Sequence, residues 1–369
     1  MLFLQTRRLS DRAGFCAALV LIVAHAYAQQ PQENPNDLLL QDYRPVSIYQ
    51  NQQTEVKAAR YPLIDLHSHP YPKSEAELDQ WVATMDELNI DQSVILSYRT
   101  GAEFDSLYRF FQKYPDRFVL FCGFDYSSYN EPDFAEKAIK ELERCYRVGA
   151  RGVGELGDKG KGLFYSKPSP AYGMHIDDPR MKPLLRKCGE LGMPISIHVA
   201  EPIWMYHPMD ANNDGLMNAY KWRLDDQEGI LGHAEMVKTL ENAVSQHPET
   251  TFIACHYANS SYDLNILGKL FDLYPNLYAD ISARFAETAT IPRTVSRFFT
   301  KYQDRLVYGS DMGMAKSMYR TTFRILETED EHFYDNDISS YHWAMNGYGL
   351  SPQVLEKVYR QNALKILGR

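Results

Sequence analysis

The stretch Leu63-Ile-Asp-Leu-His-Ser-His69 is a short apolar run that ends in two histidines. Seven further apolar runs follow it along the chain, at Ser93–Ser97, Phe118–Phe124, Ala150–Leu156, Ile195–Ala200, Thr251–His256, Leu277–Ser282 and Leu306–Ser310. Near-continuous apolar runs of this length are typical of parallel strands that are buried on both faces. The sequence therefore predicts eight buried strands.

Helical patterns separate these runs. Ser74-Glu-Ala-Glu77 is a capping box, and the residues after it repeat apolar side chains at helical spacing as far as about residue 89. A second amphipathic pattern covers residues 132–148. Eight strand–helix alternations over residues 61–369 predict one α/β domain, a (β/α)8 TIM-type barrel. An open doubly wound sheet is the alternative, but no G-x-G-x-x-G follows the first strand.

The first 60 residues do not belong to this pattern. Arg7, Arg8 and Arg12 precede the apolar run 14–24, and Ala26-Tyr27-Ala28 follows it. This order is typical of a secretory signal peptide, and the run is shorter than the roughly 18–20 residues that a membrane span needs. We expect cleavage after Ala28, an irregular N-terminal arm over 29–60, and a secreted or periplasmic protein without a membrane span.

Composition and charge narrow the functional classes. The 369 residues are 44% hydrophobic and 24% charged, which fits a globular protein. The chain carries 39 Lys and Arg against 48 Asp and Glu, a net charge of −9, and no basic run. Nucleic acid is therefore not an expected partner. Cys122, Cys145, Cys188 and Cys255 lie in strand or helix patterns, which favours buried free thiols over disulfides.

Metal-ligand side chains lie where the predicted strands end. In a (β/α)8 barrel, the carboxyl ends of the strands form one face, and this face carries the active site. Imidazole and carboxylate groups are the ligands of a catalytic zinc or related ion. Such groups occur at the ends of five of the predicted strands: His67, His69, Glu155, His198, His256 and Asp311. The sequence therefore predicts a metal site there, binding a small-molecule substrate.

In these motifs the chain resembles the amidohydrolase superfamily, and more narrowly its amidohydrolase-related (amidohydrolase-2) branch, over residues 61–369. The resemblance rests on Asp65-Leu-His67-Ser-His69, Ile197-His198, Ala254-Cys-His256 and Arg305-Leu-Val-Tyr-Gly-Ser-Asp311. It implies that His67, His69, His198 and Asp311 bind a divalent metal, usually Zn²⁺, with His256 near the substrate oxygen. One ion is favoured, while Glu155 would bridge two. The branch also includes homodimers.

Two enzymatic functions remain open at this point. A bound metal lowers the pKa of a water molecule toward neutrality, and Asp311 is placed to accept its proton, with His256 polarising the scissile bond. This chemistry predicts an exported hydrolase of an amide, ester or lactone. The alternative is a metal-dependent non-oxidative decarboxylase of the same family. A barrel that binds ligands without catalysis is disfavoured, because the His/His/His/Asp set is complete.

Substrate contacts are expected from two regions. Arg284, just after the seventh strand, has the geometry to bind a carboxylate through two N–H groups, although a loop salt bridge is an equal alternative. The insert 201–233 contains Trp204, Tyr206 and Trp222, which either line the pocket or pack. Glu201 is expected beside the ligand His198. His175, His207 and His233 are expected in loops or at the surface.

Overall fold

The computed structural model describes residues 34–51, 53–163, 171–335, 338 and 341–369. The chain divides into two compact units, residues 1–42 and residues 43–369. The described part of the first unit holds two 3₁₀ turns, η1 (Pro35–Asp37) and η2 (Leu40–Asp42). The predicted signal peptide, residues 1–28, lies outside the described residues. The second unit begins within the predicted arm, since Thr54 Oγ1 donates to Asp330 Oδ1 at 2.6 Å and Ala59 N donates to Leu88 O at 3.1 Å.

Eight parallel strands in the described residues form the centre of the second unit. They are β1 (Leu63–Ser68), β2 (Ile90–Leu96), β3 (Phe118–Phe121), β4 (Val153–Asp158), β5 (Ile195–Val199), β6 (Phe252–Ala254), β7 (Leu277–Asp280) and β8 (Leu306–Val307). They pair in order as β1-β2-β3 and β4-β5-β6-β7-β8. Backbone hydrogen bonds join the two sets, from Cys122 N to Gly152 O at 2.9 Å and from Leu66 N to Tyr308 O at 2.9 Å. The sheet therefore closes, and the predicted (β/α)8 barrel is confirmed.

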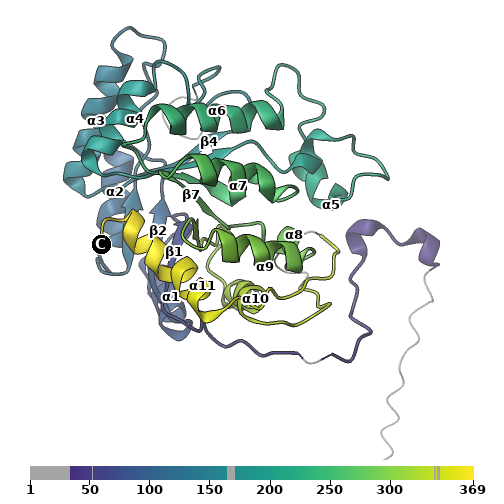
Figure 1. Ribbon diagram of the computed structural model, residues 1–369. Coiled ribbons are helices and arrows are strands. Elements are labelled where there is room, and N and C mark those ends of the chain that lie inside the picture. Colours follow the sequence, from purple (N-terminus) through teal and green to yellow (C-terminus); the bar gives the residue numbers. More distant parts are fainter. Residues whose placement is uncertain (1–33, 52, 164–170, 336–337, 339–340) are drawn as a thin grey trace, which may run out of the picture. The chain divides into compact units, whose positions relative to one another are not determined.

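Helices follow the strands and cover the outside of the barrel. The longer ones are α1 (Glu75–Glu87), α2 (Gly101–Phe111), α3 (Phe134–Val148), α4 (Lys182–Leu191), α6 (His233–Gln246), α7 (Leu264–Leu273), α9 (Pro292–Lys301) and α10 (Lys316–Glu327). The short ones are α5 (Leu216–Ala219), α8 (Phe285–Thr288), α11 (Pro352–Glu356) and α12 (Asn362–Ile366). Figure 1 shows α6, α7 and α9 side by side. The ring centres of Phe271 in α7 and Phe298 in α9 are 6.3 Å apart.

The predicted start of the first helix is confirmed. Glu77 N donates to Ser74 Oγ at 3.3 Å, and the Glu77 carboxylate accepts from Lys73 N at 2.7 Å. Ser74 is thus the N-cap, but the predicted capping box is only half formed, because the Glu77 carboxylate binds the N–H of Lys73 rather than that of Ser74. Leu78, Met85 and Leu88 are buried against the barrel, as the helical spacing predicted.

The apolar core has two layers. Side chains inside the barrel form one cluster: Ile64, Leu66, Val94, Leu96, Val119, Phe121, Ile253, Tyr278 and Val307, with Ala363 and Ile366 of α12. This helix closes the amino-terminal end of the strands, and Arg369 reaches Gln92 there at 2.8 Å. Figure 1 shows α5 at the opposite end. The larger cluster fills the space between strands and outer helices. A rigid apolar base therefore supports the polar end of the barrel.

Two further sequence predictions concern the described residues. Cys122, Cys145, Cys188 and Cys255 are free and buried, as expected. Among the described residues, no helix combines the length and apolar character needed to cross a membrane. The remaining 3₁₀ and π turns are η3 (Ile203–Tyr206), η4 (Tyr220–Trp222), η5 (Cys255–Asn259) and η6 (Lys357–Gln361).

Candidate metal centre

The five predicted metal ligands and the predicted catalytic residue His256 meet at the carboxyl ends of the strands. They come from β1, β4, β5, the turn after β6 and the segment after β8, which are far apart in sequence. His67 and His69 lie at the end of β1, where their rings are 5.3 Å apart. Closure between β1 and β8 brings Asp311 beside them, because Asp311 N donates to His67 O at 2.9 Å. The strand-end pattern in the sequence thus corresponds to one cluster in space.

A first group of donors surrounds one point. Glu155 Oε2 is 3.8 Å from His67 Nε2 and 3.4 Å from His69 Nε2. Asp311 Oδ1 is 3.7 Å and 3.0 Å from the same two nitrogens. Atoms bound to one ion at about 2.0–2.2 Å lie within about 4.4 Å of one another. His67, His69 and Glu155 therefore satisfy the spacing required of ligands to a shared ion, and Asp311 lies beside both histidines.

A second group shares Glu155. Its Oε1 atom, the other oxygen of the carboxylate, is 3.0 Å from His198 Nδ1 and 3.4 Å from His256 Nε2. His256 Nε2 is also 3.7 Å from Asp311 Oδ2. Glu155 thus presents one oxygen to each pair of histidines. This is the arrangement of a carboxylate shared between two cation positions, which the sequence left as the less favoured alternative to a single ion.

Each of the four imidazoles is held through one ring nitrogen on an oxygen acceptor. For His67 the acceptor is a side chain, because its Nδ1 contacts Asp280 Oδ2 at 2.8 Å. For the other three it is a backbone carbonyl. His69 Nδ1 lies 2.9 Å from Leu96 O, His256 Nδ1 lies 3.0 Å from Ser282 O, and His198 Nε2 lies 2.9 Å from Ala200 O. A carbonyl or an ionised carboxylate can only accept, so these nitrogens carry the N–H. In the neutral rings the second nitrogen bears a lone pair.

Those lone pairs face carboxylate oxygens, which also bear lone pairs. The His67 Nε2 atom is buried and has no hydrogen-bond partner in the structure. Facing lone pairs repel unless a proton or a cation lies between them. Histidines anchored through the opposite nitrogen are the usual form of metal ligands in proteins. The described donor set therefore fits a divalent cation, and in the metal-free chain protons must take its place.

The electrostatics of the metal-free cluster agree with this description. Burial opposes a charge on His67, but Asp280, Asp311 and Glu155 outweigh burial and raise its pKa to about 9. Burial also opposes charge on His198, yet Glu201 and Glu155 raise its pKa to about 9. Despite burial, the histidines around it hold the pKa of Glu155 well below its usual value. Without metal, His67, His69 and His198 thus favour the protonated form beside ionised carboxylates, whereas burial lowers the pKa of His256 and favours its neutral ring.

Asp280 is a functional candidate that the sequence analysis missed. It ends β7 and accepts from His67 Nδ1, while its other oxygen accepts from Ser282 Oγ at 2.6 Å and from His256 N at 2.9 Å. One buried carboxylate therefore orients two candidate ligands. The available signal was an aspartate at the end of the apolar run Leu277-Tyr-Ala-Asp280.

The turn that carries His256 departs from the predicted strand. We expected a strand through His256, but β6 ends at Ala254 and η5 follows. His256, Tyr257, Ala258 and Asn259 have φ values of 57°, 56°, 53° and 51°. Left-handed backbone costs roughly 1–2 kcal/mol for each residue other than glycine, so surrounding contacts must maintain it. The turn directs the His256 ring back over the barrel end.

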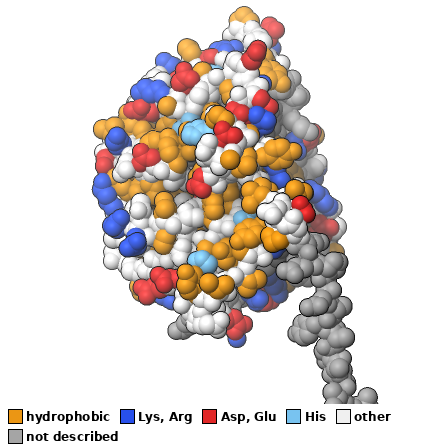
Figure 2. Space-filling view, turned by 90° about the vertical axis from the view of Figure 1, so that its right-hand side faces the viewer, with side chains coloured by type: hydrophobic (Ala, Val, Ile, Leu, Met, Phe, Trp, Pro, Cys, Tyr) orange, Lys and Arg blue, Asp and Glu red, His pale blue; other side chains and the backbone are white. Residues whose placement is uncertain are grey.

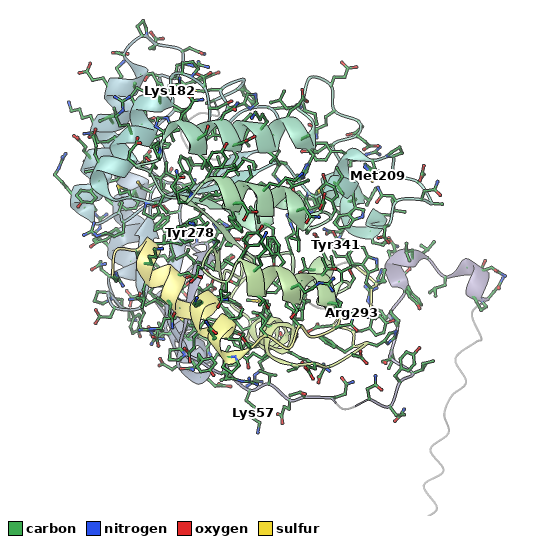
Figure 3. The ribbon with its side chains drawn as sticks, in the orientation of Figure 1. Lys57, Lys182, Met209, Tyr278, Arg293 and Tyr341 are labelled. Carbon is green, nitrogen blue, oxygen red and sulfur yellow. The ribbon has the colours of Figure 1, made fainter. Side chains whose placement is uncertain are left out.

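A cavity of about 720 Å³ opens beside the cluster. Its wall includes five of the six candidate ligands, together with Arg284, Lys159, Glu201, Met205, Trp222 and Tyr341. Tyr341, labelled in Figure 3, accepts from Asn218 of α5 at 3.0 Å and donates to Glu287 of α8 at 3.0 Å. The insert 201–233 therefore contributes to the cavity wall, as expected for a loop on this face of a barrel.

Arg284 is buried in the cavity wall. Its Nε and Nη2 atoms donate to Asn259 Oδ1 at 3.0 Å and 2.6 Å, and Nη1 donates to Ala283 O at 3.2 Å. Glu201 and Glu287 lie at 3.9 Å and 3.7 Å. Glu201 also pairs with Lys159. Burial alone would raise the pKa of Glu201, but His198, Lys159 and Arg284 lower it to about 2. Arg284 is thus a positioned cation facing the cavity.

Other sequence expectations need correction. For Trp204, the sequence left a substrate contact and packing as alternatives; it is not among the described residues that line the cavity, and it packs beside Tyr341 and Trp343, at ring distances of 6.2 Å and 5.7 Å. Its neighbours Met205 and Trp222 line the cavity instead. His233 is buried at the start of α6, where its Nε2 contacts Asn259 O at 2.9 Å, because the insert folds back onto η5. His175 contacts Asp158 at 2.6 Å, and His207 is exposed as expected.

The surface around this region shows no single charge character. On the face that Figure 2 presents, which carries α5, Lys and Arg side chains are dispersed among acidic and hydrophobic ones. A continuous basic path, as nucleic-acid binding requires, is not visible on this face. The buried cluster and its cavity are therefore the candidate site.

Comparisons with known proteins identify the class. A sequence model described as Amidohydrolase matches residues 64–369, so the chain belongs to this family and the resemblance seen in the sequence is confirmed. No curated protein gives a match. A putative amidohydrolase from Staphylococcus aureus is 16% identical with a TM-score of 0.55, and the match covers 83% of this chain and 99% of that chain.

Two other solved structures are decarboxylases by name. A 2,6-dihydroxybenzoate decarboxylase from Rhizobium is 16% identical with a TM-score of 0.51, over 84% of this chain and 99% of that chain. A dihydroxybenzoic acid decarboxylase from Polaromonas sp. JS666, with bound manganese and the inhibitor 2-nitroresorcinol, is 16% identical with a TM-score of 0.53, over 84% and 97%. At this identity the likeness shows a shared barrel fold.

Proposed function

We propose that the protein is a metal-dependent enzyme that removes carbon dioxide from a hydroxylated aromatic acid without redox chemistry. The observation that carries metal dependence is the set of four histidines, each anchored through one nitrogen and aiming the other at Glu155. The named decarboxylases among structures of the same fold support this reaction over hydrolysis. Hydrolysis of an amide, ester or lactone, the main prediction from the sequence, has less support.

His67, His69 and Glu155, with Asp311 beside them, would hold the ion, and Glu155, His198 and His256 supply donors for a second position. A divalent ion bound there supplies positive charge that polarises oxygen atoms of the substrate. The bound manganese of the Polaromonas structure makes manganese a candidate beside the predicted zinc.

Asp311 is the proposed proton carrier. Its side chain is 22% exposed and lines the cavity, whereas the carboxylate of Glu155 is largely enclosed by histidines. Decarboxylation breaks the bond between the ring carbon and the carboxyl carbon, and a proton must replace carbon dioxide on the ring. Asp311, at the cavity edge, is placed to receive that proton from solvent and to deliver it.

Arg284 is proposed to bind an oxygen of the substrate that does not react. A cation on the reacting carboxylate would stabilise the ground state, since that charge leaves as neutral carbon dioxide. A cation on a ring oxygen instead stabilises charge that develops during the reaction. The position of Arg284 in the wall of the same cavity supports this role.

Carbon dioxide release is the discriminating measurement. The manganese- or zinc-loaded protein is incubated with 2,6-dihydroxybenzoate and related hydroxybenzoates, and in parallel with amide, ester and lactone panels. We expect carbon dioxide and the decarboxylated phenol in equal amounts, formed at least about 10²-fold more slowly by Asp311→Asn. Hydrolysis products without carbon dioxide from any acid would contradict the proposal and reinstate the hydrolase.

A further inference from the structure

Asn259 is a buried side chain whose amide oxygen and amide nitrogen both have partners. Its relative exposure is 0%. The Oδ1 atom accepts from Arg284 Nε at 3.0 Å and from Arg284 Nη2 at 2.6 Å. The Nδ2 atom donates to Val199 O at 3.0 Å and to Ala200 O at 3.2 Å, at the end of β5. The side chain therefore joins the Arg284 guanidinium to the strand that carries His198.

Asn259 provides Arg284 with a neutral hydrogen-bond acceptor. Glu201 and Glu287 lie 3.9 Å and 3.7 Å from the guanidinium, beyond hydrogen-bond distance. The short contacts are to neutral oxygens, Asn259 Oδ1 and Ala283 O. A neutral acceptor orients the planar guanidinium without adding a negative charge that would compete with a ligand. One N–H on each of Nη1 and Nη2 remains for an oxyanion in the cavity.

Ala200 O connects this arrangement to the candidate metal centre. It accepts from Asn259 Nδ2 and lies 2.9 Å from His198 Nε2. The carbonyl is thus shared by the residue that orients Arg284 and by a histidine that faces Glu155. Asn259 O also lies 2.9 Å from His233 Nε2, where the insert rejoins the barrel. Asn259 makes these links through hydrogen bonds, whereas Glu201, which also lies near both Arg284 and His198, is 3.9 Å and 3.7 Å from them.

The left-handed backbone of η5 is needed for these contacts. Asn259 has φ of 51°, and asparagine tolerates this conformation better than most residues with a side chain. Glycine tolerates it without strain. A change to glycine therefore deletes the amide while leaving the turn free to keep its shape.

We propose that Asn259 is a positioning residue that fixes Arg284 as the oxyanion-binding group of the cavity and couples it to the β5 end. The inference rests on the proposed substrate-binding role of Arg284. It extends that role by naming the residue that determines the orientation of the cation.

Asn259→Gly, Arg284→Gln and a control, Asn276→Ala, test the inference. Asn276 donates to Val244 O, His247 O and Thr250 O at 3.0–3.1 Å, before β7 and away from the cavity. The control thus removes an asparagine of similar structural importance. Each metal-loaded protein is titrated with 2-nitroresorcinol by calorimetry, and labelling of Arg284 by the arginine reagent phenylglyoxal is followed by peptide mass spectrometry.

We expect Asn259→Gly to label Arg284 at least threefold faster and to bind 2-nitroresorcinol at least tenfold more weakly, with the wild-type metal content. Arg284→Gln should lose affinity to a similar degree, and Asn276→Ala should match wild type in both measurements. Wild-type labelling and affinity in Asn259→Gly would overturn the inference. Faster labelling of Arg284 in Asn259→Gly, in a protein whose wild type binds no 2-nitroresorcinol, would support the positioning role while contradicting the proposed substrate class.

Discussion

Asp311 is proposed both to bind the metal and to carry a proton to the substrate. Its Oδ1 lies 3.0 Å from His69 Nε2, and its carboxylate borders the cavity. Asp311→Asn keeps the size of the side chain and a coordinating oxygen but removes the proton-carrying carboxylate. We expect substantial metal retention and a loss of at least about 10²-fold in turnover, the lower end for removal of a general acid or base. Near-wild-type turnover at saturating metal would transfer the proton role to His256.

Asp280 is expected to affect the metal indirectly, by orienting the ring of His67. We expect Asp280→Asn to lower metal affinity about 10- to 100-fold, the range for partners that orient metal ligands, with little change in fold. Asp330→Asn is the matched control: Asp330 is buried and accepts from Thr54 and Arg324 away from the cluster. Equal metal affinities in the two variants, measured by competition with a chelating dye, would remove Asp280 from the site.

At the residue scale, the sequence predicted the six members of the cluster because strand ends must meet in a closed barrel. It missed Asp280, because this aspartate lies within an apolar run. Its role depends on the contact with His67, which forms only when the folded barrel brings the end of β7 close to the end of β1. It misplaced Trp204 and His233, because the path of a long insert depends on tertiary packing rather than on local pattern. Asn259 has no sequence signal of its own, since its contacts come from β5 and from Arg284.

Among the elements, the insert 201–233 contains one tryptophan that lines the cavity and one that packs against other aromatic rings. Trp222 lines the cavity, is 55% exposed and has Lys159 Nζ 4.8 Å from its ring centre, whereas Trp204 packs on Tyr341 and Trp343. Trp222→Ala should raise KM about fivefold, the equivalent of about 1 kcal/mol of lost contact, with Tm unchanged. Trp204→Ala should instead lower stability by about 1–3 kcal/mol. Reversed effects, from kinetics and thermal unfolding, would restore Trp204 as the substrate contact.

The strands and helices themselves followed from the sequence, whereas the turn after β6 did not. Apolar runs and the N-cap at Ser74 are local signals, and the structure confirms them. Four successive left-handed residues without glycine are not encoded by local preference. They persist because Asp280 binds His256 N, and Asn259 binds the end of β5. These contacts join residues that are far apart in the sequence, so the local sequence pattern does not predict the turn.

For the whole molecule, metal uptake should be coupled to proton release. In the metal-free chain the pKa values of His67 and His198 are raised from 6.5 to about 9, so both rings are protonated at pH 7. Their stabilising contribution to the metal-free fold is complete below pH 6.5 and is lost as the pH rises through 9. Metal must displace these protons, so its affinity should increase with pH up to about 9.

Calorimetry in buffers of different ionisation enthalpy measures this coupling directly. We expect more than one proton to be released for each chain that fills with metal at pH 7, and fewer at pH 9. A binding enthalpy that does not depend on the buffer would show that the histidines are already neutral, contrary to the charge network of the metal-free cluster.

The N-terminal segment carries a separate prediction. If residues 1–28 direct export, the mature chain begins at Gln29. Mass spectrometry of the protein from the periplasm or medium of a producing cell measures this. An uncleaved chain confined to the cytoplasm would contradict the predicted location without affecting the barrel or its site.

Metal binding is the property on which the proposed activity depends, and we expect a divalent ion in the cluster formed by His67, His69, Glu155, His198, His256 and Asp311. The most direct measurement is elemental analysis of the purified chain after loading with manganese or zinc and extensive dialysis, beside His67→Ala and His69→Ala. We predict at least one ion per chain in the wild type and marked loss in both variants, with circular dichroism unchanged because the apolar layers below the cluster hold the barrel. A wild-type chain without metal, or variants that keep it fully, would contradict the account.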